Sequence, residues 1–81
     1  MLDDRRGAFR RNAFTFGAVT GIGPEIECLV WDATESGAQI EVADPDRVPD
    51  RFDLRLTVDA PARPVAVAWR RGRRLGLTFL G

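Results

Sequence analysis

The sequence predicts an all-β fold: a small six-stranded antiparallel β-barrel with an extended, arginine-rich N-terminal arm and little or no helix. Apolar and polar residues alternate in short runs, which is the pattern of strands with one buried face. Turn-forming segments separate these runs about every 8–12 residues, a spacing typical of barrels and sandwiches. No apolar 3.6-residue period extends over three helical turns. The 81 residues suffice for one domain.

Residues 1–12 are polar and arginine-rich, and we expect them to form the arm, with the barrel at 13–81. The strands are expected at about 13–19, where Phe14 and Phe16 indicate the first, and then at 25–31, 37–43, 52–58, 64–70 and 74–80. The clearest run is 52–58, where every even position is apolar. The apolar positions of the other four runs are Ile26, Cys28 and Val30; Ala38, Ile40 and Val42; Val65, Val67 and Trp69; and Leu75, Leu77 and Phe79.

Gly, Pro, Asp and Ser supply the turns between these runs. The turn segments are 21–24, 35–37, 44–46, 59–61 and 71–73. Helix is expected at most as a short turn around 46–50. Because Trp69 has the same parity as Val65 and Val67, the alternation places its side chain in the core.

The composition argues against an enzyme. The chain has no His, no Lys and no Tyr, and it has one Ser and one Cys. It therefore lacks a Ser-His or Cys-His pair, an imidazole metal site and a Schiff-base lysine. Most carboxylates alternate with apolar residues, as on solvated strand faces. We expect no catalytic residue, no metal and no cofactor.

The single cysteine, Cys28, lies in an apolar run and is interpreted as a small buried hydrophobic residue. One cysteine cannot form an intrachain disulfide, which suits a reducing cytoplasm. The N-terminus has no apolar signal-peptide region, and no stretch approaches the roughly 18 apolar residues of a membrane helix. We therefore expect a cytoplasmic protein without membrane insertion.

Charge is balanced overall and clustered locally. Twelve arginines offset twelve acidic residues, so the formal net charge is zero, which makes bulk nucleic acid an improbable main partner. The arginines gather at the two ends of the chain, at Arg5, Arg6, Arg10 and Arg11, and at Arg70, Arg71, Arg73 and Arg74. Exclusive use of arginine favours bidentate recognition of phosphate or a base edge, although genome composition is an equally good explanation.

Two local patterns bear on function. The arm contains an R-R-x-x-x-R arrangement at Arg5, Arg6 and Arg10, and a D-x-T-x-x-G turn follows the second strand at Asp32, Thr34 and Gly37. Each is weak alone, because an arginine-rich arm is usually a solvated tail and such a turn is usually only a capped turn. Their order, and their place around a small barrel, carry more weight.

With these motifs the sequence resembles the PilZ domain family. The likeness continues through 28–40, 65–70 and 75–79, and so covers almost the whole chain. The resemblance implies a six-stranded antiparallel barrel that is a receptor for the bacterial second messenger cyclic di-GMP. It also implies that Arg5, Arg6, Arg10, Asp32, Thr34 and Gly37 bind this ligand on the outside of the barrel. The arm would then become ordered on the ligand and transmit the signal to a downstream protein partner.

The chemistry of cyclic di-GMP fits these residue types. Guanine presents O6 and N7 acceptors to a guanidinium and N–H donors to a carboxylate. Arg5, Arg6 and Arg10 would contact the guanine edges, the rings and the phosphates, and Asp32 would accept from the donor edge. Thr34 would hydrogen-bond nearby, and Gly37 would permit a turn or a close approach that a Cβ would hinder.

The sequence departs from the family pattern at three places. Thr34 stands where the family usually has Ser, which adds one methyl group beside the ligand. Glu35 adds a carboxylate next to the turn, and the interpretation favoured here is that it points to water. The sequence ends two residues after Phe79, where many family members continue into a helix.

Two other function classes remain open. A small barrel that binds single-stranded nucleic acid through its arginine clusters would need surface aromatic residues for base stacking. Only Phe9, Trp31 and, against its parity, Trp69 are available for this. A barrel of the same fold that binds only proteins is the third interpretation.

Overall fold

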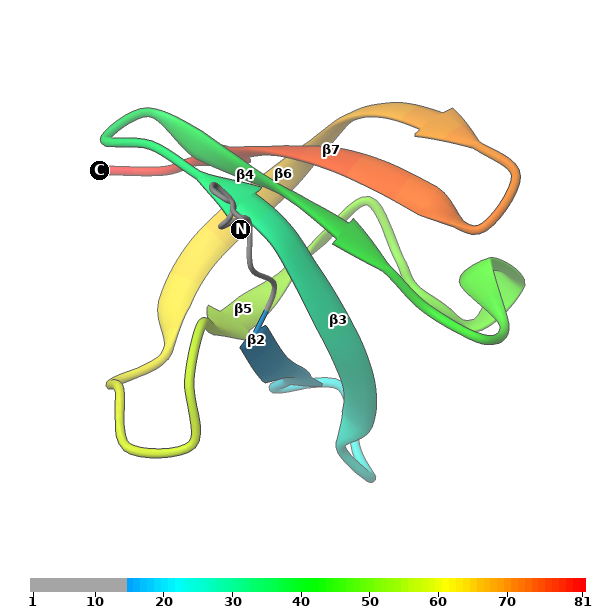
Figure 1. The fold of residues 1–81 in the computed structure, drawn as a ribbon. Coiled ribbons are helices and arrows are strands. Elements are labelled where there is room, and N and C mark those ends of the chain that lie inside the picture. The colour runs from blue at the N-terminus through cyan, green and yellow to red at the C-terminus, as the bar shows by residue number, and fades with distance from the viewer. Residues whose placement is uncertain (1–14) are drawn as a thin grey trace, which may run out of the picture.

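The computed structural model describes residues 15–81, and these form a closed six-stranded antiparallel barrel (Figure 1). The predicted fold class is therefore confirmed. The elements in chain order are β2 (Thr15–Thr20), β3 (Ile26–Ala33), β4 (Gly37–Glu41), the 3-10 turn η1 (Pro45–Arg47), β5 (Arg51–Arg55), β6 (Arg63–Arg71) and β7 (Arg74–Phe79).

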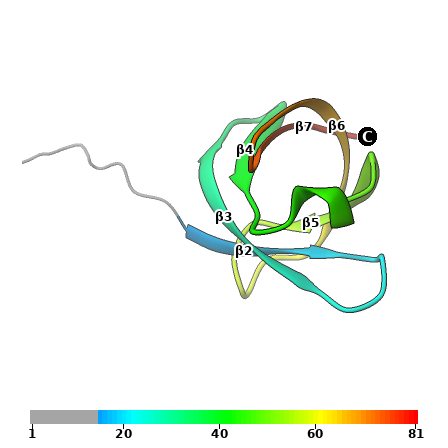
Figure 2. The same ribbon diagram turned by 90° about the vertical axis from the view of Figure 1, so that its right-hand side faces the viewer.

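The strands follow one another around the barrel in the order β2-β3-β4-β7-β6-β5, and β2 pairs with β5 to close the ring (Figure 2). All six pairings are antiparallel. Closure gives every strand two neighbours, which limits exposed sheet edges. The predicted arm lies outside the described residues.

Alternation predicts most of the core correctly. The buried apolar side chains are Val19, Cys28, Val30, Ile40, Val42, Val48, Phe52, Leu54, Val65, Leu75 and Leu77. Cys28 is 3% exposed, which confirms its interpretation as a small buried residue. Val48 was not part of the predicted core, because it follows η1 rather than lying in an alternating run.

Two strand predictions need correction. The alternation that marks the first strand would turn Phe16 toward the core. In β2 the inward positions are instead Gly17 and Val19, and Phe16, which pairs with Leu29, lies on the outer face and is 61% exposed. The fourth predicted strand, 52–58, is too long: β5 ends at Arg55, and Val58 is 80% exposed. The chain leaves the sheet there because the next turn begins early, with the Ala60 amide donating to the Thr57 carbonyl.

Arg70 closes one end of the barrel. Its guanidinium donates to the carbonyl oxygens of Pro45 and Val48, at 3.2 and 2.8 Å, and pairs with Asp50 at 3.0 Å. These bonds tie the turn η1, which lies across the opening of the ring in Figure 2, to the end of β6. One of the clustered arginines therefore serves the fold.

Candidate functional site

A β-bulge in β3 sets the direction of Asp32. Val30 pairs with Ile40, but Asp32 pairs with Gln39, so Trp31 is an extra residue between the two pairs. Strict alternation would place Asp32 inside with Val30. The extra residue instead turns Asp32 to the outer face, where it is exposed. Among residues 15–81, its carboxylate belongs to none of the ion pairs.

Thr34 organises the turn that joins β3 to β4. Its hydroxyl oxygen accepts from the backbone amides of Ser36 and Gly37, at 3.2 and 3.3 Å. The Thr34 amide donates to the Gly37 carbonyl at 2.8 Å and completes the turn. The side chain therefore has a structural role that is independent of any ligand, as Ser and Thr commonly have in turns.

Gly37 is required by a close approach between strands. It pairs with Thr78 of β7, and a Cβ at this position would collide with the backbone carbonyl oxygen of Leu77. The close approach expected at Gly37 therefore exists, and the group that approaches is strand β7.

Trp69 lies outside the barrel, contrary to its predicted place in the core. Val67 pairs with Leu77, but Trp69 pairs with Gly76, so Ala68 is an extra residue in β6. This second bulge reverses the direction of every side chain that follows it. Trp69 is 42% exposed, and its indole lies directly over Gly76, where a Cβ would collide with it. The signal in the sequence is Gly76 itself, since a glycine within a strand often marks close approach of another group.

The two bulges bring Asp32 and Trp69 to the same outer surface. Register places Asp32, Gln39, Gly76 and Trp69 side by side on the neighbouring strands β3, β4, β7 and β6 (Figure 1). A hollow of about 300 Å³ lies here, which we call the Asp32–Trp69 hollow. Its lining residues include Asp32, Thr34, Gly37, Gln39, Trp69 and Gly76.

The structure thus brings together three of the six predicted site residues, Asp32, Thr34 and Gly37, in one hollow. The other three, Arg5, Arg6 and Arg10, lie outside the described residues. Sequence reasoning missed Trp69 and Gln39 as lining residues. Arg71 lies near the indole, with its guanidinium carbon 5.9 Å from the centre of the Trp69 ring.

A second aromatic group lies beside the hollow. The Arg74 guanidinium stacks over Trp31, 4.4 Å from the ring centre, and its Nη1 donates to Gln39 Oε1 at 2.7 Å. Glu41 accepts at one carboxylate oxygen from Trp31 Nε1 at 3.0 Å and from Arg74 Nε at 3.4 Å. The contacts hold these four side chains in one network on the outer faces of β3, β4 and β7.

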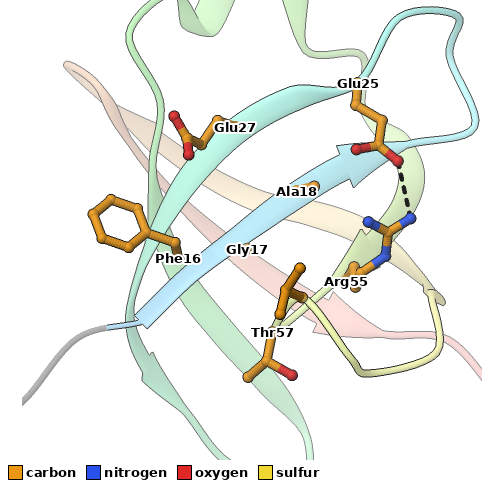
Figure 3. A pocket seen from close by; sticks show the side chains of 8 residues that line it. Phe16, Gly17, Ala18, Glu25, Glu27, Arg55 and Thr57 are labelled. Carbon is orange, nitrogen blue, oxygen red and sulfur yellow. Dashed lines mark hydrogen bonds and ion pairs between the residues drawn. The ribbon is translucent and has the colours of Figure 1, made fainter.

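Another hollow, of about 290 Å³, lies over β2 (Figure 3). Phe16 and Glu27 line one part of it, and an ion pair of 2.9 Å between Arg55 and Glu25 lines another. It contains none of the predicted site residues.

Burial raises the pKa of the Cys28 thiol from 9.0 to about 11. The negative charge of Glu27 acts in the same direction, and a hydrogen bond with the Gly17 backbone opposes it. Cys28 is therefore a neutral thiol at physiological pH and a poor nucleophile. Residues 15–81 contain no cluster of three or more side chains that could hold a metal ion.

Comparisons of the chain with family models, with curated proteins and with solved structures found no match. Nowhere in residues 15–81 is there a helix with the length and apolar character needed to cross a membrane.

Proposed function

We propose that this protein is a cyclic di-GMP receptor domain that binds the ligand in the Asp32–Trp69 hollow. The observation that carries the proposal is the placement of an exposed carboxylate, Asp32, and an exposed indole, Trp69, on one surface beside the Thr34 turn. A guanine base needs a face to stack on and an acceptor for its N–H donors, and this pair offers both.

In this proposal the parts of the site have different tasks. Trp69 stacks on a guanine ring, and Asp32 accepts hydrogen bonds from the ring's N–H groups. Arg5, Arg6 and Arg10 of the arm contact the guanine acceptors and the two phosphates, for which the planar guanidinium is suited. Thr34 and Gly37 fix the turn that holds Asp32 in place. A downstream protein partner would then respond to the arm in its ligand-bound position.

The test is a calorimetric titration of cyclic di-GMP into the wild type and four variants. Asp32→Ala and Arg6→Ala should each weaken binding at least about tenfold, because a charged hydrogen bond contributes roughly 1.5–3 kcal/mol. Trp69→Leu should weaken it by a similar factor, because stacking contributes about 1–3 kcal/mol per base.

Arg73→Ala is the charge-matched control, since Arg73 lies in the β6–β7 turn outside the hollow. It should leave the affinity within about twofold of the wild type, the range expected for a distant screened charge. A loss in Arg73→Ala as large as that in Arg6→Ala, with Asp32→Ala and Trp69→Leu binding as tightly as the wild type, would mean diffuse electrostatic attraction and would refute the site. Unliganded Arg6→Ala should melt at nearly the wild-type temperature, because Arg6 belongs to the arm.

A second candidate function is binding of single-stranded nucleic acid. The exposure of Trp31 and Trp69, at 39% and 42%, favours it, because both indoles lie on the outside of the barrel near Arg74 and Arg71. This candidate predicts affinity for oligonucleotides that falls steeply with salt concentration. If the protein binds cyclic di-GMP and oligonucleotides fail to displace this ligand, the nucleic-acid candidate is contradicted.

A further inference from the structure

Gln39 lines the Asp32–Trp69 hollow between two of its other lining residues, Asp32 and Gly76. On β4 it pairs with Asp32 of β3 on one side and with Gly76 of β7 on the other. Its side chain is half-buried and lines the hollow. Because Cβ atoms of directly paired antiparallel residues lie about 4.5–5.5 Å apart, the Gln39 amide and the Asp32 carboxylate can contact one ligand group together.

Arg74 fixes which way the Gln39 amide faces. Arginine has only donors, so the group it approaches at 2.7 Å must be the amide oxygen, Oε1. The NH2 group of Gln39 must then turn away from Arg74. Arg74 is itself held by the Trp31 ring and by Glu41, so it is anchored on two further sides. Asp32, the β3 partner of Gln39, supplies a carboxylate acceptor on the same outer face, so amide donors and a carboxylate acceptor can meet one ligand group here.

This order of donors and acceptors matches guanine and opposes adenine. The pairing edge of guanine carries two N–H donors, which suit a carboxylate, next to O6, which suits an amide N–H. Adenine carries the opposite order, an N–H donor at position 6 next to a ring-nitrogen acceptor. A site built to pair with one order leaves groups unpaired with the other, which penalises the wrong base.

We propose that Gln39 is a specificity-determining residue that, together with Asp32, selects guanine over adenine, and that Arg74 is the positioning residue that keeps its amide in the selective orientation. This inference rests on the proposed function, because it assumes that a guanine-containing ligand occupies the hollow. It assigns roles to two residues that belong to neither of the sequence motifs.

The test compares cyclic di-GMP with cyclic di-AMP by calorimetric titration and uses the ratio of their affinities. Both ligands carry two phosphates, so a change in site charge shifts the two affinities together and leaves the ratio unchanged. Gln39→Glu keeps the shape and still accepts from Arg74, but it has no N–H donor. Gln39→Leu removes the amide altogether. Each should lower the guanine-to-adenine ratio at least about tenfold, the range of one lost base contact.

Arg74→Leu should lower the same ratio by a smaller factor, about three- to tenfold, because the freed amide can turn over. Arg74→Lys keeps a donor to Oε1 and should restore most of the ratio. Arg73→Leu, the neighbouring arginine outside the hollow, should leave it unchanged. Circular dichroism of each unliganded variant checks that the barrel is intact.

The outcomes separate this inference from the function on which it rests. A wild type that binds neither ligand refutes both. A wild type that binds cyclic di-GMP, with Gln39 variants that keep the wild-type ratio, refutes the role of Gln39 alone. An unchanged ratio in Arg74→Leu, with a lowered ratio in the Gln39 variants, refutes the positioning role of Arg74.

Discussion

Asp32 and Trp69 each owe their outward direction to one extra residue in a strand. Trp31 in β3 and Ala68 in β6 are the extra residues, and without them both side chains would point inward. A buried, unpaired carboxylate would destabilise so small a barrel, because taking a charge out of water costs several kcal/mol. The bulges therefore allow the strands to carry an acid and an indole on the outside of an apolar core.

At Cys28 we predict a specific loss of stability in alkali. The folded-state pKa is about 11, against 9.0 for the free thiol, so the folded protein holds its proton more tightly. The resulting stabilisation is fully present below pH 9 and is lost as the pH rises through 11. The free energy of unfolding should fall by about 2 kcal/mol between pH 8 and pH 11.

Urea unfolding at several pH values measures this loss. The absence of Lys and Tyr makes the interval unusually clear, because no other side chain of the chain normally titrates between pH 9 and 11. Cys28→Ala lowers stability at every pH through lost packing, but its stability should be nearly independent of pH in this interval. An equally steep decline in Cys28→Ala would show that another group is responsible.

At the scale of elements, the turn between β3 and β4 depends on one hydroxyl. Thr34→Val keeps the shape but loses the acceptor for the amides of Ser36 and Gly37. We expect a loss of about 1 kcal/mol, which lowers the melting temperature by roughly 4–8 °C in a domain of this size. Thr34→Ser, which keeps the hydroxyl, is the control.

Thermal unfolding of the unliganded variants makes this measurement. If Thr34→Val and Thr34→Ser have the same melting temperature, the hydroxyl does not stabilise the turn. The expected result would mean that Thr34 supports a ligand site mainly by holding the turn that follows Asp32.

The strands themselves were predictable because alternation follows directly from burying one face of a strand. Ile26, Cys28 and Val30 in β3, and Leu75 and Leu77 in β7, face the core in full or in part as expected. The bulges were not predictable from alternation. The apolar residues that precede a bulge alternate in the same way as in a regular strand, so they do not show that an extra residue follows. For that reason alternation predicts the wrong face for Trp69. The sequence signal for its true position is Gly76, because a Cβ there would collide with the indole.

At the scale of the whole molecule, barrel closure positions the candidate site. Neither β3 nor β4 pairs with β6, but the order β3-β4-β7-β6 places Asp32 and Trp69 on one curved outer surface. The turn motif could be located from the sequence, since it follows a clear strand. The Trp69 and Gln39 contributions could not, because they depend on the two bulges and on the pairing of β4 with β7, which are distant in the sequence.

The central claim is that cyclic di-GMP binds the folded barrel specifically, and thermal unfolding with increasing ligand tests it most directly. A ligand that binds only the folded state must stabilise it, by about 2.7 kcal/mol at 100 times its Kd. We expect the melting temperature to rise by about 10 °C or more with cyclic di-GMP and to stay unchanged with GMP or GTP. No rise at about 1 mM cyclic di-GMP, or an equal rise with GTP, would contradict the claim.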